Sequence, residues 1–309
     1  MMRTFNIILI SALILVTISG AYGAKYKNFD PSLFKFDTID RKNIKIIAEG
    51  GNALYAPENT VTSFKQAVDM GTDLMLIDVR ITADKQAVAI KDFTIDRTTS
   101  GYGEVSQLTL DELKSYSAGY ESVFEDTYEY ETVPSLVEVF TVLKNKPCII
   151  NVFNVFDIPF IRNSANKANY SESNMILLLD NVTDITVIKN NAKKIKFFLS
   201  DPLSEYFNTE EKLKWVENAK KGGVDGFLIS YDEFFDLPKQ EQGSLAILMA
   251  KNNIGLYLYG LRSNVDMDKA MSFQIKGKVK NKAYTCKLAG IITDDPAKAL
   301  MVAGKLKIK

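Results

Sequence analysis

Hydrophobic and polar positions follow two rhythms along the chain. Short apolar runs rich in β-branched residues alternate with longer segments in which apolar residues recur every three or four positions. Nine runs predict buried strands, at 44–50, 74–81, 87–92, 148–153, 175–180, 195–200, 226–230, 255–260 and 290–294. Strands that alternate with helices indicate an α/β fold whose parallel sheet is covered on both faces.

The clearest helix is predicted over "ENTVTSFKQAVDMG", residues 58–71. Asn59 or Thr60 is suited to cap its start, and Gly71 to end it. Its apolar stripe consists of Val61, Phe64, Ala67 and Val68. Similar patterns predict helices within 106–116, 133–145, 210–223 and 296–309.

Nine strands are one more than a (β/α)8 barrel needs, and the second and third explain the excess. Only "TADKQ" separates them, whereas parallel neighbours need a connection of about a dozen residues. They are therefore predicted to form an antiparallel hairpin that returns Lys91 to the neighbourhood of Asp78. The chain of 309 residues fits one such barrel, which typically takes roughly 250.

The N-terminus has the pattern of a secretory signal. Arg3 precedes the apolar stretch "IILISALILVTI", and the small residues of "AYG" follow it. An uncleaved anchor is the alternative, although the stretch is short for a membrane span of about 20 residues. The expected organisation is a signal peptide at 1–23, a lead-in segment at 24–43 and one barrel at 44–309. The mature protein is expected to lack a transmembrane span and to be periplasmic or extracellular.

Composition removes several classes of function. Lys and Arg total 38, as do Asp and Glu, so bulk charge does not favour nucleic acid as a partner. The chain has no histidine, which excludes any histidine-dependent mechanism. Cys148 and Cys286 could pair or remain as buried thiols, and the sequons at Asn169 and Asn181 matter only in a host that glycosylates.

One stretch, "GYESVFEDTYEYET" at 119–132, mixes acidic and aromatic residues and contains no basic residue. It is either an exposed loop or a surface that binds a protein partner, because interfaces are enriched in aromatic residues. The candidate partner-binding residues are Tyr120, Phe124, Glu125, Asp126, Tyr128 and Tyr130.

Five segments in a fixed order carry a family resemblance. They are "IIAEGGNALYAPENTVTSFKQAVDMGTDLMLIDVRIT", "VAIKDFTIDRTTSGYGEVSQLTLDELKS", "TVPSLVEVF", "CIINVFNV" and "LAGIITDDPAKAL". In these the chain, from about 44 to 304, resembles glycerophosphodiester phosphodiesterases, which are TIM barrels of the phosphatidylinositol-phospholipase-C type. Between about 155 and 250 only the strand–helix rhythm matches.

The resemblance also locates departures from the family pattern. The family's first catalytic histidine and its phosphate-binding arginine fall at Glu49 and Gly50, and its second histidine falls at Lys91. Of its three metal-binding carboxylates only Asp78 remains, because Leu76 and Phe153 occupy the other two positions. Val155 stands where the family has a lysine.

These departures predict a barrel that binds no metal or other cofactor. Phosphodiester cleavage needs proton transfer and a cation that neutralises the developing charge, and Mg²⁺ or Ca²⁺ needs several oxygen ligands. We expect instead an internal ion pair between Lys91 and Asp78 or Glu49, in place of the metal.

The main functional expectation is an exported, catalytically inactive relative that serves as a structural or protein-binding module or assembles with itself. One alternative is a protein that binds phospholipid headgroups or glycerophosphodiesters without cleaving them, for which Lys91 and Arg97 are the clear nearby cations. The other alternative is a phosphodiesterase that retains activity through Glu49, Asp78 and Lys91.

Overall fold

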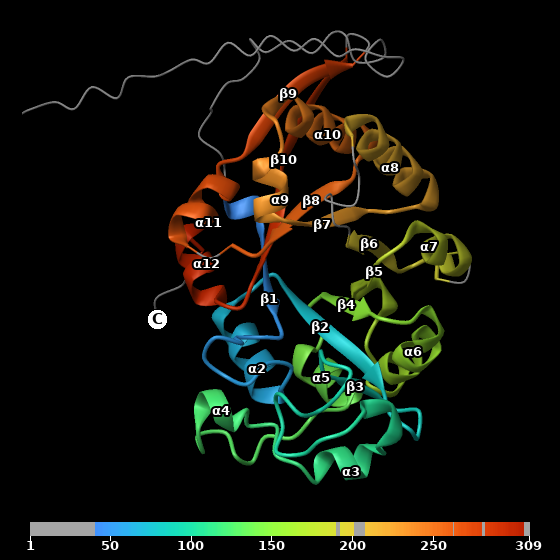
Figure 1. The fold of residues 1–309 in the computed structure, drawn as a ribbon, viewed down its shortest axis with the longest axis vertical. Coiled ribbons are helices and arrows are strands. Elements are labelled where there is room, and N and C mark those ends of the chain that lie inside the picture. The colour runs from blue at the N-terminus through green and yellow to red at the C-terminus, as the bar shows by residue number, and fades with distance from the viewer. Residues whose placement is uncertain (1–40, 190–191, 201–207, 262, 280–281, 306–309) are drawn as a thin grey trace, which may run out of the picture.

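Eight parallel strands close into a barrel at the centre of the molecule (Figure 1). The computed structural model describes residues 41–189, 192–200, 208–261, 263–279 and 282–305. The predicted signal peptide lies outside these residues. The barrel strands are β1 Lys45–Glu49, β2 Leu74–Ile81, β4 Cys148–Val152, β5 Met175–Leu179, β6 Lys196–Ser200, β7 Gly226–Ser230, β8 Gly255–Tyr259 and β10 Lys282–Thr293. This architecture confirms the predicted (β/α)8 fold.

Closure joins the two ends of the described chain. β1 pairs in parallel with both β2 and β10, with Ile46 opposite Ile291 on the β10 side. The short strand β3, Ala87–Ala89, pairs antiparallel with β2, and Val79 lies opposite Ala89. The predicted hairpin after the second strand is therefore confirmed.

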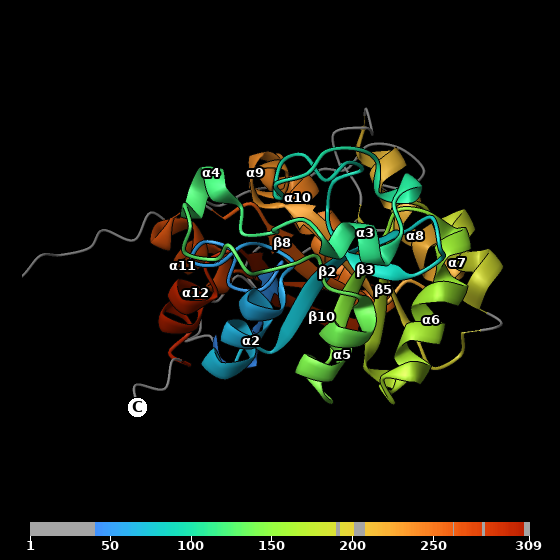
Figure 2. The same ribbon diagram turned by 90° about the horizontal axis from the view of Figure 1, so that it is seen from below.

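Helices surround the barrel on its outside (Figure 2). They are α2 Val61–Met70, α3 Leu110–Lys114, α4 Glu121–Phe124, α5 Leu136–Leu143, α6 Ile158–Lys167, α7 Val182–Ile188, α8 Thr209–Gly222, α9 Tyr231–Asp236, α10 Lys239–Asn252, α11 Asn264–Met271 and α12 Pro296–Val302. As the pattern predicts, Thr60 caps α2 by accepting from the Ser63 amide, and Gly71 ends the helix with a φ of 87°. In the part of the chain described here, no helix is both long and apolar enough to cross a bilayer.

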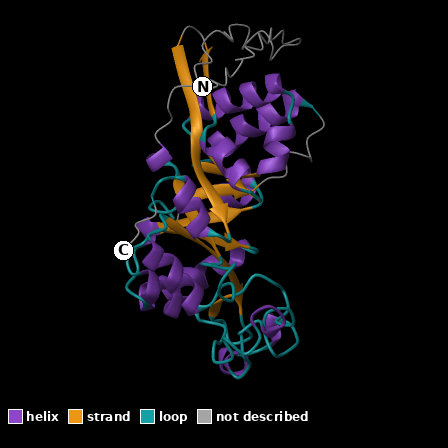
Figure 3. Cartoon of the chain, turned by 90° about the vertical axis from the view of Figure 1, so that its left-hand side faces the viewer, coloured by secondary structure: helices purple, strands orange, loops and turns teal. Residues whose placement is uncertain are grey.

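The structure adds one strand that the search for apolar runs misses. β9, Gln274–Val279, pairs antiparallel with the first half of β10, and the two form a ribbon that extends from the barrel (Figure 3). Its sequence alternates buried Ile275 and Val279 with lysines. This period-2 pattern marks a strand with one solvent-facing side, not a strand buried on both faces.

Inside the barrel, alternation along each strand stacks an apolar layer beneath a polar one. Ile47, Leu76, Ile149 and Ile292 lie in the interior apolar cluster. Because side chains two positions apart point to the same face of a strand, the residues that follow each by two turn toward the mouth, at the carboxyl ends of the strands. These are Glu49, Asp78, Asn151 and Asp294.

Tyr257 packs against the interior apolar cluster, and glycines make room for its ring. A Cβ atom added at Gly226, Gly255 or Gly290 would come within 2.8 Å of its ring. The interior is therefore packed below the mouth, as is typical of this barrel fold.

Candidate functional site

The end of β1 and the loop that follows it position Glu49, a charged group at the mouth of the barrel. Glu49 ends the strand, and Gly50 and Gly51 follow with φ values of 60° and 92°. At Gly51 a Cβ atom would lie 2.4 Å from the Ser63 hydroxyl oxygen, so only glycine allows the loop to approach the start of α2 this closely. The turn therefore accounts for both glycines of "EGG".

Glu49 and Lys91 form the central ion pair. The Lys91 Nζ lies 3.1 Å from the Glu49 Oε1. The β2–β3 hairpin brings Lys91 back to the end of β1, where Glu49 lies. Burial raises the pKa of Glu49, and Lys91 only partly opposes this effect. Burial also disfavours the Lys91 ammonium, but Glu49 and Asp78 outweigh it and raise the pKa of Lys91. Lys91 therefore stays cationic near neutral pH.

Asp78 accepts hydrogen bonds from two side-chain amides and is not the ion-pair partner of Lys91. Its side chain is only 2% exposed. The Asn151 Nδ2 donates to one carboxylate oxygen at 2.8 Å, and the Asn59 Nδ2 donates to the other at 3.2 Å. Asn59 also accepts from the Asp78 backbone amide at 3.2 Å. The predicted internal ion pair thus forms with Glu49, and the amides satisfy Asp78.

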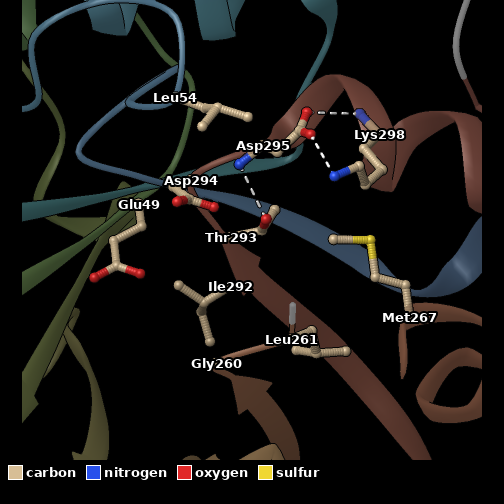
Figure 4. Close-up of a pocket in the computed structure, with 10 residues that line it drawn as sticks. All are labelled: Glu49, Leu54, Gly260, Leu261, Met267, Ile292, Thr293, Asp294, Asp295 and Lys298. Carbon is tan, nitrogen blue, oxygen red and sulfur yellow. Dashed lines mark hydrogen bonds and ion pairs between the residues drawn. The ribbon is translucent and has the colours of Figure 1, made fainter. Parts of the chain in front are cut away.

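Two neighbouring cavities open at the mouth. One, of about 190 Å³, is lined by Glu49, Gly50, Ala53, Glu58, Asn59, Asp78, Lys91 and Asp294. The other, of about 360 Å³, shares Glu49 and Asp294 with the first. Figure 4 shows its further lining, with Leu54 on one side, Ile292, Leu261 and Met267 on another, and Lys298 bound to Asp295. Together they offer charged groups beside an apolar wall.

The positions where the resemblance places metal ligands do not fit a divalent cation. Leu76 is buried in the apolar layer, and Phe153 presents an aromatic ring. The one remaining carboxylate, Asp78, accepts from an amide at each oxygen. Across the residues that the structure describes, no three Asp, Glu, Cys or His side chains gather closely enough to hold a metal ion.

Arg97, a predicted cation of the mouth, is occupied by other protein groups. Its guanidinium donates to Glu58 at 2.6 Å and 3.0 Å and to Asp92 at 2.5 Å. It also donates to the Tyr120 hydroxyl at 3.3 Å. These contacts clamp the segment after β3 to the start of α2, which leaves the Arg97 side chain with a structural role.

The acidic aromatic stretch folds against the mouth. Tyr120, Phe124 and Tyr128 contact one another edge to face, and the Tyr128 hydroxyl donates to the Tyr55 carbonyl at 2.8 Å. Tyr130 is 91% exposed, and Glu125 and Asp126 are exposed as well. A role in partner binding remains a prediction, for which only the exposed residues offer free surface.

Arg80 is the functional candidate that sequence reasoning missed. Its Nε and Nη2 donate to the Lys91 carbonyl oxygen at 3.1 Å and 2.9 Å, and its guanidinium carbon lies 3.7 Å from the centre of the Phe153 ring. Its place two residues after Asp78 on β2 was the available signal, because both side chains point toward the mouth.

Comparison with known proteins gives relatives over part of the chain. The chain is 39% identical over 107 residues to a glycerophosphodiester phosphodiesterase of Caldanaerobacter subterraneus, a match that covers 35% of this chain and 43% of the relative. It is 32% identical over 103 residues to the Bacillus subtilis glycerophosphodiester phosphodiesterase, covering 33% and 34%. The matches thus span less than half of these curated relatives.

Solved structures share the fold over nearly the whole barrel. A glycerophosphodiester phosphodiesterase from Agrobacterium tumefaciens matches with a TM-score of 0.62 and 18% identity, covering 84% of this chain and 99% of the other. An Oleispira antarctica phosphodiesterase in complex with the product sn-glycerol-3-phosphate matches with a TM-score of 0.68 and 18% identity, covering 84% and 96%.

These comparisons overturn the expectation of a catalytically inactive structural module. The relatives and structural neighbours described above are named as phosphodiesterases, and none is named for a structural role. The physical error was to equate the loss of histidine with the loss of proton-transfer groups. Glu49 and Lys91 retain a carboxylate and an ammonium at the positions that the resemblance assigns to the two histidines.

The family description for glycerophosphoryl diester phosphodiesterases matches residues 50–298, which is most of the chain. It includes β2, the β2–β3 hairpin and the mouth ends of all later strands. The chain therefore belongs to the glycerophosphoryl diester phosphodiesterase family.

Proposed function

We propose that this protein is a phosphodiesterase that hydrolyses glycerophosphodiesters at a site rebuilt around Glu49, Asp78 and Lys91. The observation that carries the proposal is the Glu49–Lys91 pair, 3.1 Å apart, in a cavity at the carboxyl ends of the barrel strands. Active sites of this fold lie at that end of the barrel. The family match supports the reaction class.

Glu49 is suited to act as the general base. Its pKa is raised and so lies closer to neutral pH than that of an ordinary glutamate. A general base is most effective when its pKa is close to the working pH. In the proposed step, the oxygen of a water molecule forms a bond to phosphorus while the bond from phosphorus to the alcohol oxygen breaks. One proton of the water passes to Glu49, and the departing alcohol takes a proton from solvent.

Lys91 is suited to bind the phosphoryl group. Its side chain is 48% exposed and its pKa is raised, so it offers a stable positive charge to an entering anion. Asp78 keeps the lysine in place electrostatically while it is itself held by Asn59 and Asn151. The adjoining cavity of about 360 Å³ gives room for the alcohol group.

The test is release of glycerol phosphate from glycerophosphocholine and glycerophosphoethanolamine. We expect turnover by the purified full-length chain and a loss of about 100-fold in kcat/KM for Glu49→Gln, in line with removal of a general base. Asp69→Asn and Lys65→Met are matched controls, because both residues are exposed on α2. Binding of these compounds without turnover would refute the proposal and favour a non-hydrolytic binder.

We also propose that the protein is exported. The support is the order of Arg3, the apolar stretch at 7–18 and the small residues at 21–23. N-terminal sequencing of the protein from its native source tests this, with a new terminus near Ala24 expected and a retained Met1 as the contrary result.

A further inference from the structure

The mouth carries fixed positive charge where metal ligands are missing. Lys91 lies in the same cavity as Asp78 and Glu49, and its ammonium approaches Glu49 to 3.1 Å. A lysine supplies one point charge with three N–H donors, which is what a phosphoryl oxygen needs from a neutralising cation. The cavity thus contains a permanent cation, the Lys91 ammonium, supplied by the protein.

A second group holds the backbone of Lys91, from which the ammonium extends. Arg80 donates twice to the Lys91 carbonyl, at 3.1 Å and 2.9 Å. The guanidinium is in turn stacked on the Phe153 ring, 3.7 Å from its centre, a contact that is favourable and orients the planar group. Burial lowers the pKa of Arg80, and Asp78 opposes that effect.

The departures at positions 91 and 153 are therefore connected in space. Phe153 stands where a carboxylate would attract Arg80 away from the Lys91 carbonyl. As an aromatic ring it gives the guanidinium a flat support and leaves its N–H donors for that carbonyl. Phe153, Arg80 and the backbone of Lys91 therefore form one continuous set of contacts.

We propose that the Lys91 ammonium, positioned by Arg80 and Phe153, replaces the divalent cation, so that phosphodiester hydrolysis at this mouth is independent of metal. The inference rests on the proposed phosphodiesterase function and adds how the phosphate charge is neutralised. Lys91 is the residue that touches the substrate, and Arg80 and Phe153 are positioning residues.

The first test compares turnover of glycerophosphocholine after dialysis against EDTA with turnover in added Mg²⁺, Ca²⁺ or Mn²⁺. We expect rates within twofold of one another. Stimulation of tenfold or more by any of the three ions would overturn the inference and leave the phosphodiesterase function intact. Absence of turnover in every condition would instead refute the proposed function, and binding then decides the inference.

Binding is measured by calorimetry and thermal shift on the same protein. We expect no saturable binding of Ca²⁺, Mg²⁺ or Mn²⁺, and a rise in Tm with sn-glycerol 3-phosphate that is lost in Lys91→Met and retained in Lys65→Met. Saturable metal binding that Asp78→Asn abolishes would overturn the inference. Failure of sn-glycerol 3-phosphate to shift the Tm of the unmodified chain would overturn it as well.

Rescue separates a missing charge from a damaged fold. Lys91→Ala should lose about 100-fold in kcat/KM, as for removal of one charge-stabilising donor, and ethylammonium should restore part of it by entering the vacated space. Lack of rescue in a variant with an unchanged Tm would count against a neutralising role. Arg80→Met and Phe153→Leu should shift the acid limb of the kcat/KM profile to higher pH, because a displaced lysine no longer lowers the pKa of Glu49. An unchanged limb would contradict the positioning role.

Discussion

Replacement of Asn59 by alanine removes both hydrogen bonds that this residue makes to Asp78. Each bond is 3.2 Å long, and the two side chains are 3% and 2% exposed. Loss of a bond to a buried carboxylate costs about 2 kcal/mol, and an orphaned buried amide adds about 1 kcal/mol. Asn59 also has a φ of 59°, a left-handed conformation that costs alanine about 1 kcal/mol more than asparagine.

Asn253→Ala is the matched control. Asn253 has a φ of 55° at the end of α10 and an exposed side chain, so this change should cost only the conformational term of about 1 kcal/mol. Asn59→Ala should lose about 3 kcal/mol more than the control. That is a large share of the 5–15 kcal/mol by which folded domains are typically stable, and for a barrel of this size it corresponds to a fall in Tm of about 5 °C.

Urea unfolding of the two variants and the unmodified chain measures these differences. The single tryptophan, Trp215, is buried and stacked on Phe227 with ring centres 4.0 Å apart, so its fluorescence reports loss of the barrel packing. If Asn59→Ala is destabilised no more than Asn253→Ala, the hydrogen bonds between Asn59 and Asp78 contribute nothing to stability. The account of how Asp78 is held is then wrong.

Three further predictions concern titration, thiols and the acidic aromatic stretch. Because burial raises the pKa of Glu49 and Lys91 lowers it, activity should fall as pH drops through a pKa above the ordinary glutamate value, and in Lys91→Met this acid limb should move to higher pH. A limb at the same pH in both proteins would contradict Glu49 as the base. Cys148 and Cys286 are unpaired, and burial raises the pKa of each to about 12, so both should react with iodoacetamide only in denaturant; modification of the folded protein would refute their burial. Tyr128→Phe removes a 2.8 Å bond to a backbone carbonyl and should lower stability by about 1 kcal/mol and speed proteolysis within 119–132, whereas unchanged cleavage would mean that the bond does not anchor the stretch.

The sequence predicted the architecture well because the relevant signals are local. Apolar runs identify the barrel strands directly, and the five residues between the second and third runs are too few for anything except a hairpin. The return of Lys91 to the neighbourhood of Asp78 followed from that hairpin. These inferences needed only periodicity and connection length, whereas the pairing of Lys91 with Glu49 was suggested by the family resemblance.

The contacts of the mouth could not be predicted in the same way. Arg80 meets the Lys91 carbonyl and the Phe153 ring only because β2 is flanked by β3 on one side and β4 on the other. The hydrogen bond from the Asn151 side-chain amide to Asp78 likewise depends on the register between β2 and β4, where the two residues are opposite one another. Sequence reasoning located the substitutions but not their mutual contacts, and it interpreted the substitutions alone as a loss of activity.

The pairing of β1 with β10 has a consequence for how the protein is made. Ile46 and Ile291 are opposite one another at this pairing, so β1 leaves the ribosome long before its partner strand has been synthesised. Until Thr293 has been synthesised, one edge of β1 and one edge of β8 are unpaired, and unpaired edges invite aggregation. Contacts so distant in sequence form slowly. Barrel closure is thus a late step of folding, and nascent chains that stop before β10 should need a chaperone to remain in solution.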